Sequence, residues 1–101
     1  MSLTVIYWRD IPTQLSFGKG RKAKKRPLAD RFMVAVDKAA MVSGAADDDS
    51  YLEEWRREEI DIGDEAPEAA MERIASELEE QYPTKTLAQL AQNGGRNTLE
   101  A

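Results

Sequence analysis

The run Leu3-Thr4-Val5-Ile6-Tyr7-Trp8-Arg9-Asp10-Ile11-Pro12 decides the fold of this chain. Its first six residues are rich in β-branched and aromatic side chains, and both faces of the resulting strand are largely apolar. That pattern is typical of a central strand, or of an edge strand covered by a partner. Pro12 lacks an amide donor and restricts the residue before it, so we expect a turn here. The alternating residues that follow predict a hairpin of residues 3–9 with residues 13–18.

Three longer elements are predicted beyond the hairpin. Apolar residues at helical spacing indicate a helix that begins near Pro27 and closes at Ser43-Gly44. Polar and apolar residues alternate over residues 57–62, which predicts a third strand. A second helical stripe predicts a helix over residues 67–82, and a short final helix is expected to end at Asn93-Gly94-Gly95.

A short helix is also expected between the first long helix and the third strand. Ser50 and Glu53 form the S-x-x-E pattern of a capping box, which predicts a helix that begins at Tyr51. Leu52 and Trp55 are its expected apolar anchors. The element order therefore predicts an α+β fold, with a small antiparallel sheet of about three strands covered on one face by two main helices.

The chain length of 101 residues suits one domain. We expect it over residues 1–95, with a frayed tail at residues 96–101. The beginning of the sequence has none of the features of a secretory signal. No run of about 20 apolar residues occurs, so we expect a cytoplasmic protein without a membrane span.

The sequence contains no cysteine and no histidine. Disulfides, thiolate metal sites and cysteine nucleophiles are excluded, and the commonest general base and neutral metal ligand are missing. Asp47-Asp48-Asp49 lacks the spacing of a calcium loop, and a solvated linker explains it better. We therefore expect a protein that is not an enzyme by itself and that holds no cofactor.

Charge is distributed unevenly along the chain. The net charge of −5 combines +6 over residues 1–45 with −11 over residues 46–101. Residues 19–26, here called the basic segment, follow Gly18 and are expected to form an exposed loop or a frayed first helical turn. Its expected binding residues are Lys19, Arg21, Lys22, Lys24, Lys25 and Arg26.

Three partners are compatible with the basic segment. An anionic protein surface or ligand is one, and the domain's own acidic half or a neighbouring copy is another. Nucleic acid is the third, with Tyr7, Trp8 and Phe17 available for stacking, but the sequence pI of about 4.8 disfavours it. The phosphate-loop pattern G-x-x-x-x-G-K-[ST] is not matched.

Two arginine-containing motifs are further candidates. Trp8-Arg9-Asp10 can form an anion clamp, but we favour a structural role in the turn before Pro12. Trp55-Arg56-Arg57 is either an interface hot spot or a core tryptophan with charged neighbours. Our first hypothesis has an exposed Trp8 or Trp55 completing the contact, with Arg9 and Arg56 beside them.

Several segments together carry a family resemblance. They are the run 5–12, Gly18 to Arg26, Arg31-Phe32 with Ala39-Ala40-Met41, and Tyr51-Leu52 with Glu54-Trp55-Arg56. In this order they resemble a small bacterial family known as the virulence factor domain, over roughly residues 3–58. The acidic part from about residue 59 onward matches nothing we can name.

The resemblance implies an accessory or assembly role, because some family members are joined to helical-repeat and iron–sulfur-scaffold-like domains. Short members also look associated with one-carbon (folate) metabolism proteins. We therefore expect a non-catalytic accessory subunit that binds another protein, with self-association into a homo-oligomer as a further option. A small subunit of a folate-dependent enzyme complex is the alternative. No catalytic residue can be carried over from the family.

Overall fold

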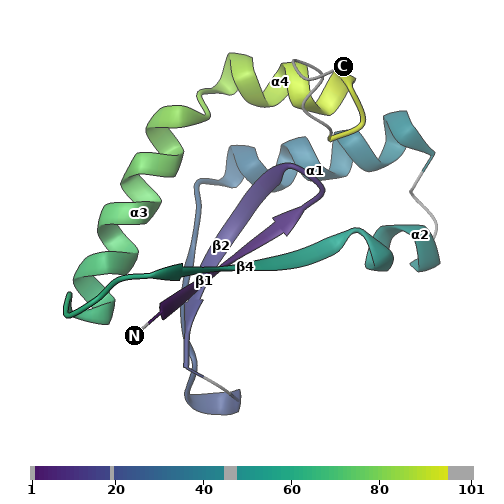
Figure 1. Cartoon of the computed structure of the whole chain (residues 1–101). Coiled ribbons are helices and arrows are strands. Elements are labelled where there is room, and N and C mark those ends of the chain that lie inside the picture. Colours follow the sequence, from purple (N-terminus) through teal and green to yellow (C-terminus); the bar gives the residue numbers. More distant parts are fainter. Residues whose placement is uncertain (1, 19, 45–47, 96–101) are drawn as a thin grey trace.

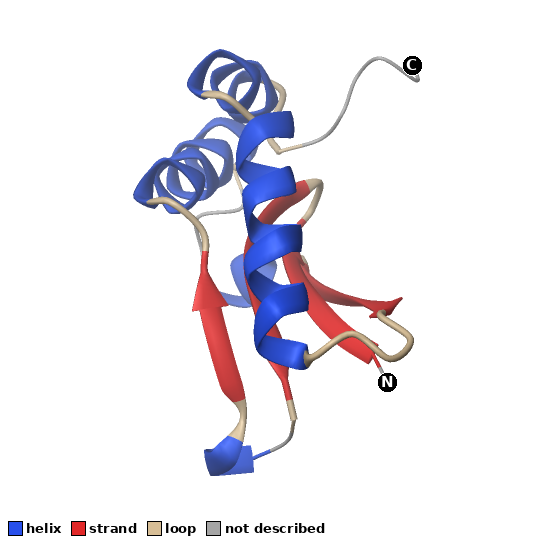
Figure 2. Cartoon of the chain, turned by 90° about the vertical axis from the view of Figure 1, so that its left-hand side faces the viewer, coloured by secondary structure: helices blue, strands red, loops and turns tan. Residues whose placement is uncertain are grey.

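The computed structural model describes residues 2–18, 20–44 and 48–95, with the side chains of 48–50 left out. This part of the chain forms an α+β fold in which one antiparallel sheet carries helices on one side (Figure 1, Figure 2). In chain order the elements are β1 (Ser2–Trp8), β2 (Ile11–Phe17), the 3-10 helix η1 (Gly20–Lys22), β3 (Lys24–Pro27), α1 (Asp30–Ser43), α2 (Asp48–Glu53), β4 (Trp55–Asp61), α3 (Pro67–Gln81) and α4 (Thr84–Gln92). The predicted fold class is confirmed, with four strands where about three were expected.

The sheet has the strand order β3-β2-β1-β4, so β1 is a central strand, which is one of the two positions that its apolar faces predicted. It pairs antiparallel with β2 as the predicted hairpin, and with β4 on its other side. The register of β1 and β2 shifts between Ile6 and Tyr7. Thr13 lies at this irregularity, and its hydroxyl donates to the Ile6 carbonyl over 2.8 Å, which ties the two strands together where the regular ladder is interrupted.

The two faces of the sheet differ in burial. Leu3, Val5 and Leu15 are fully buried and share the face on which α1 and α3 lie. Thr4 and Ile6 alternate with them and are half-exposed. The core continues through Phe32 and the other buried positions of the predicted helical stripes.

The helices confirm most of the predicted boundaries. Gly44 caps α1 with a left-handed φ of 78°, which glycine adopts without a steric penalty. Pro67 lies in the first turn of α3, where its missing amide hydrogen costs little. The helix α4 packs along α1 and completes the helical layer. None of the helices described by the structure is long and apolar enough to cross a lipid bilayer.

The prediction of a loop or helical turn over the basic segment is wrong for its last three residues, and Pro27, expected near the start of a helix, continues the same strand. These residues form β3, an edge strand paired antiparallel with β2, and α1 starts three residues after Pro27. Strand pairing uses main-chain groups that every residue type except proline carries in full, so a run of cations can join an edge without an apolar pattern. This is why periodicity did not reveal it.

The predicted short helix is also displaced. Helix α2 starts at Asp48 instead of Tyr51, so Ser50 lies inside it and the expected capping box does not mark its start. Trp55 belongs to β4, and Leu52 is 64% exposed instead of being an apolar anchor. Pairing with β1 extends β4 back to Trp55, which lies opposite Trp8.

Candidate anion-binding surface

The predicted binding residues fall into two groups at opposite ends of β2. Lys24 of the basic segment pairs with Phe17 at the end of β2, whereas Trp8 pairs with Ile11 at its beginning. A strand of this length separates the groups by roughly 20 Å. Lys19 lies outside the described residues. The sequence suggested one continuous surface, and the structure divides it.

The first group protrudes from the molecule. Figure 1 shows η1 beyond the end of β2, away from α1 and α4. Arg21 and Lys22 in η1 and Lys25 in β3 are exposed, and none of the three forms an ion pair with a described residue. We refer to Arg21, Lys22 and Lys25 as the free cations.

The other two cations of β3 are neutralised within the chain. Lys24 forms an ion pair with Glu68 of α3, and the Arg26 Nε lies 2.9 Å from Glu72 Oε1. A third carboxylate, Glu79, lies 3.8 Å from Arg26 Nη1. Alternation along β3 explains the division, because Lys24 and Arg26 share the face covered by α3 while the side chain between them points the opposite way. The basic segment therefore pairs with the acidic half through two of its described members.

A shallow groove of about 390 Å³ runs between β3 and α3. Its lining is mostly charged, with Met71 as the apolar member. The groove carries both signs of charge, because its residues from β3 are cations and two of its residues from α3 are carboxylates. Its lining residues are Lys24, Lys25, Arg26, Glu68, Met71 and Glu72.

Trp8, in the second group, is fully buried, so the expectation that it is exposed is wrong. Its indole Nε1 donates to the carbonyl of Tyr51 over 2.9 Å, and the two ring centroids are 5.8 Å apart. On another side the ring lies so close to Gly95 that a Cβ built there would approach it to 3.0 Å. Helix α2 and the turn that follows α4 thus lie against this side chain.

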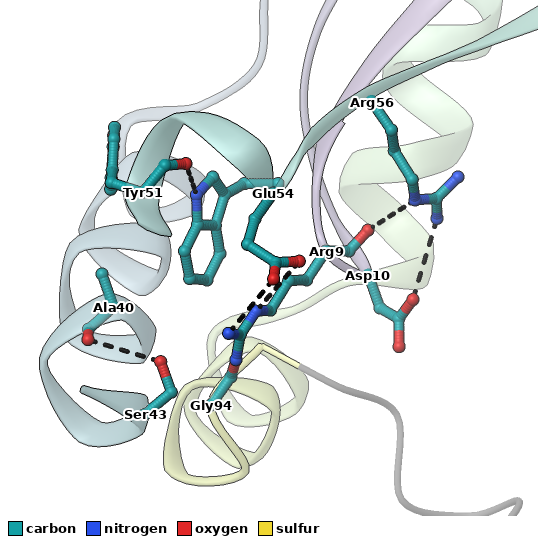
Figure 3. A network of polar contacts seen from close by, with 9 residues as sticks. Arg9, Asp10, Ala40, Ser43, Tyr51, Glu54, Arg56 and Gly94 are labelled. Carbon is teal, nitrogen blue, oxygen red and sulfur yellow. Dashed lines mark hydrogen bonds and ion pairs between the residues drawn. The ribbon is translucent and has the colours of Figure 1, made fainter. Parts of the chain in front are cut away.

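Arg9 joins three parts of the chain, as Figure 3 shows. Its Nη1 donates to the Gly94 carbonyl over 2.8 Å, and its Nε lies 3.3 Å from Glu54 Oε2. The side chain is only 14% exposed, and its own backbone is left-handed with a φ of 54°. These contacts support the structural interpretation of Arg9. The partners stand 45 and 85 positions away in the sequence, where no local pattern could indicate them.

Arg56 completes this network from β4. Its Nε donates to the Arg9 carbonyl over 2.9 Å, its Nη2 lies 3.7 Å from Asp10, and its guanidinium lies 4.3 Å from the ring centroid of Tyr7. Arg9 and Asp10 are thus held by other residues instead of clamping an anion together. Trp55 is half-buried and meets Tyr51 edge-on.

Two tyrosines near this network have raised pKa values. Burial is the main cause of the raised pKa of Tyr7, followed by the charges of Tyr82 and Glu58. Burial also dominates the raised pKa of Tyr82, with Asp10 as the next cause. Both phenols therefore stay neutral well above pH 7, and both rings pack against the core.

The chain matches the model of the virulence factor family over residues 6–91. Because this match covers most of the chain, the protein belongs to that family. The match extends beyond residue 58 through α3 and into α4, so the acidic helical part is included in the family domain. No curated protein and no solved structure matches the chain.

Proposed function

We propose that this protein is a non-catalytic binding subunit whose free cations contact an anionic surface of a partner protein. The observation that carries the proposal is that Arg21, Lys22 and Lys25 are exposed at a protruding end of the molecule and form no ion pair with a described residue, while Lys24 and Arg26 beside them are neutralised. Exposed cations attract anionic groups, so an anionic partner would supply the counter-charge that the described residues do not.

Edge protection is a structural explanation for part of this charge. Lysine on an edge strand hinders pairing with other chains, and this accounts for Lys25 in β3. It does not account for Arg21 and Lys22, which lie in η1 outside the strand. Their charge is better explained by binding.

A protein partner fits the rest of the molecule better than nucleic acid does. The chain has a net charge of −5, and α3 presents Glu68 and Glu72 next to the cations. The negative net charge disfavours a long polyanion, whereas a folded protein can place a few carboxylates locally against the free cations. The absence of histidine and cysteine from the sequence supports a role without catalysis. A one-carbon-metabolism enzyme is the first partner to try, since family resemblance suggests it.

The test compares two double charge reversals in the native host. Lys22→Glu with Lys25→Glu should weaken the affinity for the co-purified partner by roughly tenfold or more and flatten its dependence on salt. Lys38→Glu with Lys85→Glu makes the same change of charge at exposed positions of α1 and α4 and should leave the affinity unchanged. Affinity is measured by titration of the purified pair at several salt concentrations.

Two results would contradict the proposal. One is equal weakening by both double variants, which would make the effect one of net charge. The other is tight, salt-sensitive binding of an oligonucleotide near physiological ionic strength, which would place the protein among nucleic-acid binders.

A further inference from the structure

The strand β4 forms the other edge of the sheet, opposite β3, and its edge is long. It runs over seven residues without a proline, and among the strands that the structure describes β1 alone pairs with it. Its inner side pairs with β1 along its whole length, from Trp55 to Asp61. An edge of this kind presents main-chain donors and acceptors that can pair with another strand.

Hydrogen bonds near the two edges of the sheet show which main-chain groups of β4 point away from β1. The Arg9 amide donates to the Glu54 carbonyl over 3.1 Å, and successive residues of a strand alternate in direction. Residues 56, 58 and 60 therefore face β1, and Trp55, Arg57 and Glu59 direct their main-chain groups away from the sheet. A second hydrogen bond leads to the same assignment. The Leu28 amide donates to the Thr13 carbonyl, which shows which residues of β2 face β3, and the strand pairings carry this alternation through β1 to β4.

The edge at β3 is less suited to the addition of another strand than the edge at β4. It has only four residues, and the outward main-chain groups there belong to Lys25 and Pro27. Proline has no amide hydrogen, and short edges that carry lysine and proline resist strand addition. Strand addition to this sheet is therefore favoured at β4 alone.

The side chains of β4 fit a second copy of the same strand. Two β4 strands can pair antiparallel about a two-fold axis at Glu58, and all seven residues of each strand then overlap. Arg57 of each copy lies opposite Glu59 of the other copy, so the symmetry forms this pair of opposite charges twice. Arg57 and Glu59 are exposed, and neither forms an ion pair with a described residue. The two copies of Glu58 meet at the axis, where each is neutralised by Arg56 of its own chain at 2.5 Å.

We propose that β4 pairs with β4 of a second copy in this register, so that the two sheets join into one. The dimer uses the opposite edge from the free cations and does not depend on their proposed role. A register centred on Arg57 would instead bring two arginines together and leave residues at one end unpaired, which makes it less favourable.

The experiment measures the association constant by sedimentation equilibrium of the full chain. Arg57→Glu and Glu59→Arg each place like charges opposite one another twice, so each should raise the dimer Kd roughly tenfold or more. The double variant R57E/E59R restores opposite charges and should return the Kd to within about threefold of the original. Lys38→Glu and Glu80→Arg repeat the single charge changes on exposed helical positions and should leave the Kd unaltered.

Amide hydrogen exchange tests the main-chain pairing independently. The amides of Arg57 and Glu59 should become protected as the concentration rises, whereas those of Arg56 and Glu58 are bonded to β1 and should be protected throughout. A chain that stays monomeric at every concentration overturns the proposal. So does a dimer in which the charge swap fails to restore affinity, or in which the Arg57 amide still exchanges freely.

Discussion

The two ends of β2 carry similar residue types that serve different purposes. At one end, Trp8 and Arg9 lie against α2 and the turn that follows α4. The Trp8 indole and the Arg9 Nη1 donate to carbonyl groups, and Arg9 forms an ion pair with Glu54. At the other end, Arg21 and Lys22 are exposed and make no ion pair with a described residue. Both ends looked like binding surface in the sequence. Arginine and tryptophan are common in interfaces and also in structural networks, so residue type alone does not separate the two roles.

The largest expected difference between the two ends concerns Trp8. Trp8→Ala removes a fully buried ring and should lower the free energy of unfolding by about 3–5 kcal/mol, a large share of the stability of a small domain. Lys22→Ala, at the exposed end, should change it by less than about 0.5 kcal/mol. Urea unfolding followed by fluorescence or circular dichroism measures both. A loss below about 1 kcal/mol for Trp8→Ala would show that the ring is not enclosed as described.

A pair of glycines sharpens the comparison. Gly95 and Gly20 both have positive φ, of 87° and 66°, but a Cβ at Gly95 would lie 3.0 Å from the Trp8 ring while one at Gly20 would meet nothing within 4 Å. Gly20→Ala should therefore cost about 1 kcal/mol from backbone strain alone, and Gly95→Ala about 2–4 kcal/mol because overpacking is added. Thermal and urea unfolding of the two variants test this. Equal losses would mean that the space around Trp8 accommodates a methyl group.

Arg9 should show a smaller effect that can be divided into two parts. Arg9→Ala removes the bond to Gly94 and the ion pair with Glu54, and should cost about 2 kcal/mol. Arg9→Gly loses the same contacts but relieves the left-handed backbone, so its loss should be about 1 kcal/mol smaller. A double-mutant cycle with Glu54→Gln isolates the ion pair. An Arg9→Gly variant less stable than Arg9→Ala would contradict the role of backbone strain.

The smallest expected effects are those of the paired cations in β3. Lys24→Ala should change stability by less than about 0.5 kcal/mol, because the Lys24 and Glu68 side chains are 58% and 65% exposed and water screens their attraction. Arg26→Ala should cost somewhat more, up to about 1 kcal/mol, since its side chain is 30% exposed and faces two carboxylates. Repeating the unfolding measurements at high salt should erase the Lys24 effect first. A loss above about 2 kcal/mol for Lys24→Ala would mean that this pair supports the fold as Arg9 does.

Patterns with a regular period predicted the fold well. The hairpin, the central position of β1 and the two long helices followed from alternation, helical spacing and the chemistry of glycine and proline at element ends. The exceptions were the start of α2, where the expected capping box does not mark the boundary, and β3 with the start of β4, which lack a regular pattern. Lys24 is in a strand because β2 offers it main-chain partners, and Trp55 because β1 does. The signal that places each residue in a strand is therefore in the neighbouring strand and not in its own local sequence.

The candidate site was predicted less completely. The charge of the basic segment was visible in the sequence, but the division into neutralised and free cations depends on which side of β3 faces α3. For Arg9 the sequence favoured a structural role in the turn over an anion clamp, but it did not indicate the partners Glu54 and Gly94. The burial of Trp8 was missed, because the residues that enclose it come from α2 and from the end of α4.

The sequence by itself determined the class of fold, the uneven distribution of charge and, through the lack of histidine and cysteine, the exclusion of several catalytic chemistries. These properties depend on composition or on contacts between near neighbours along the chain. Tertiary structure alone decided which cations are neutralised, which tryptophan is buried and which sheet edge remains open. Each of these depends on contacts between residues tens of positions apart, and the free energy of such contacts is set by burial and geometry that no local pattern records.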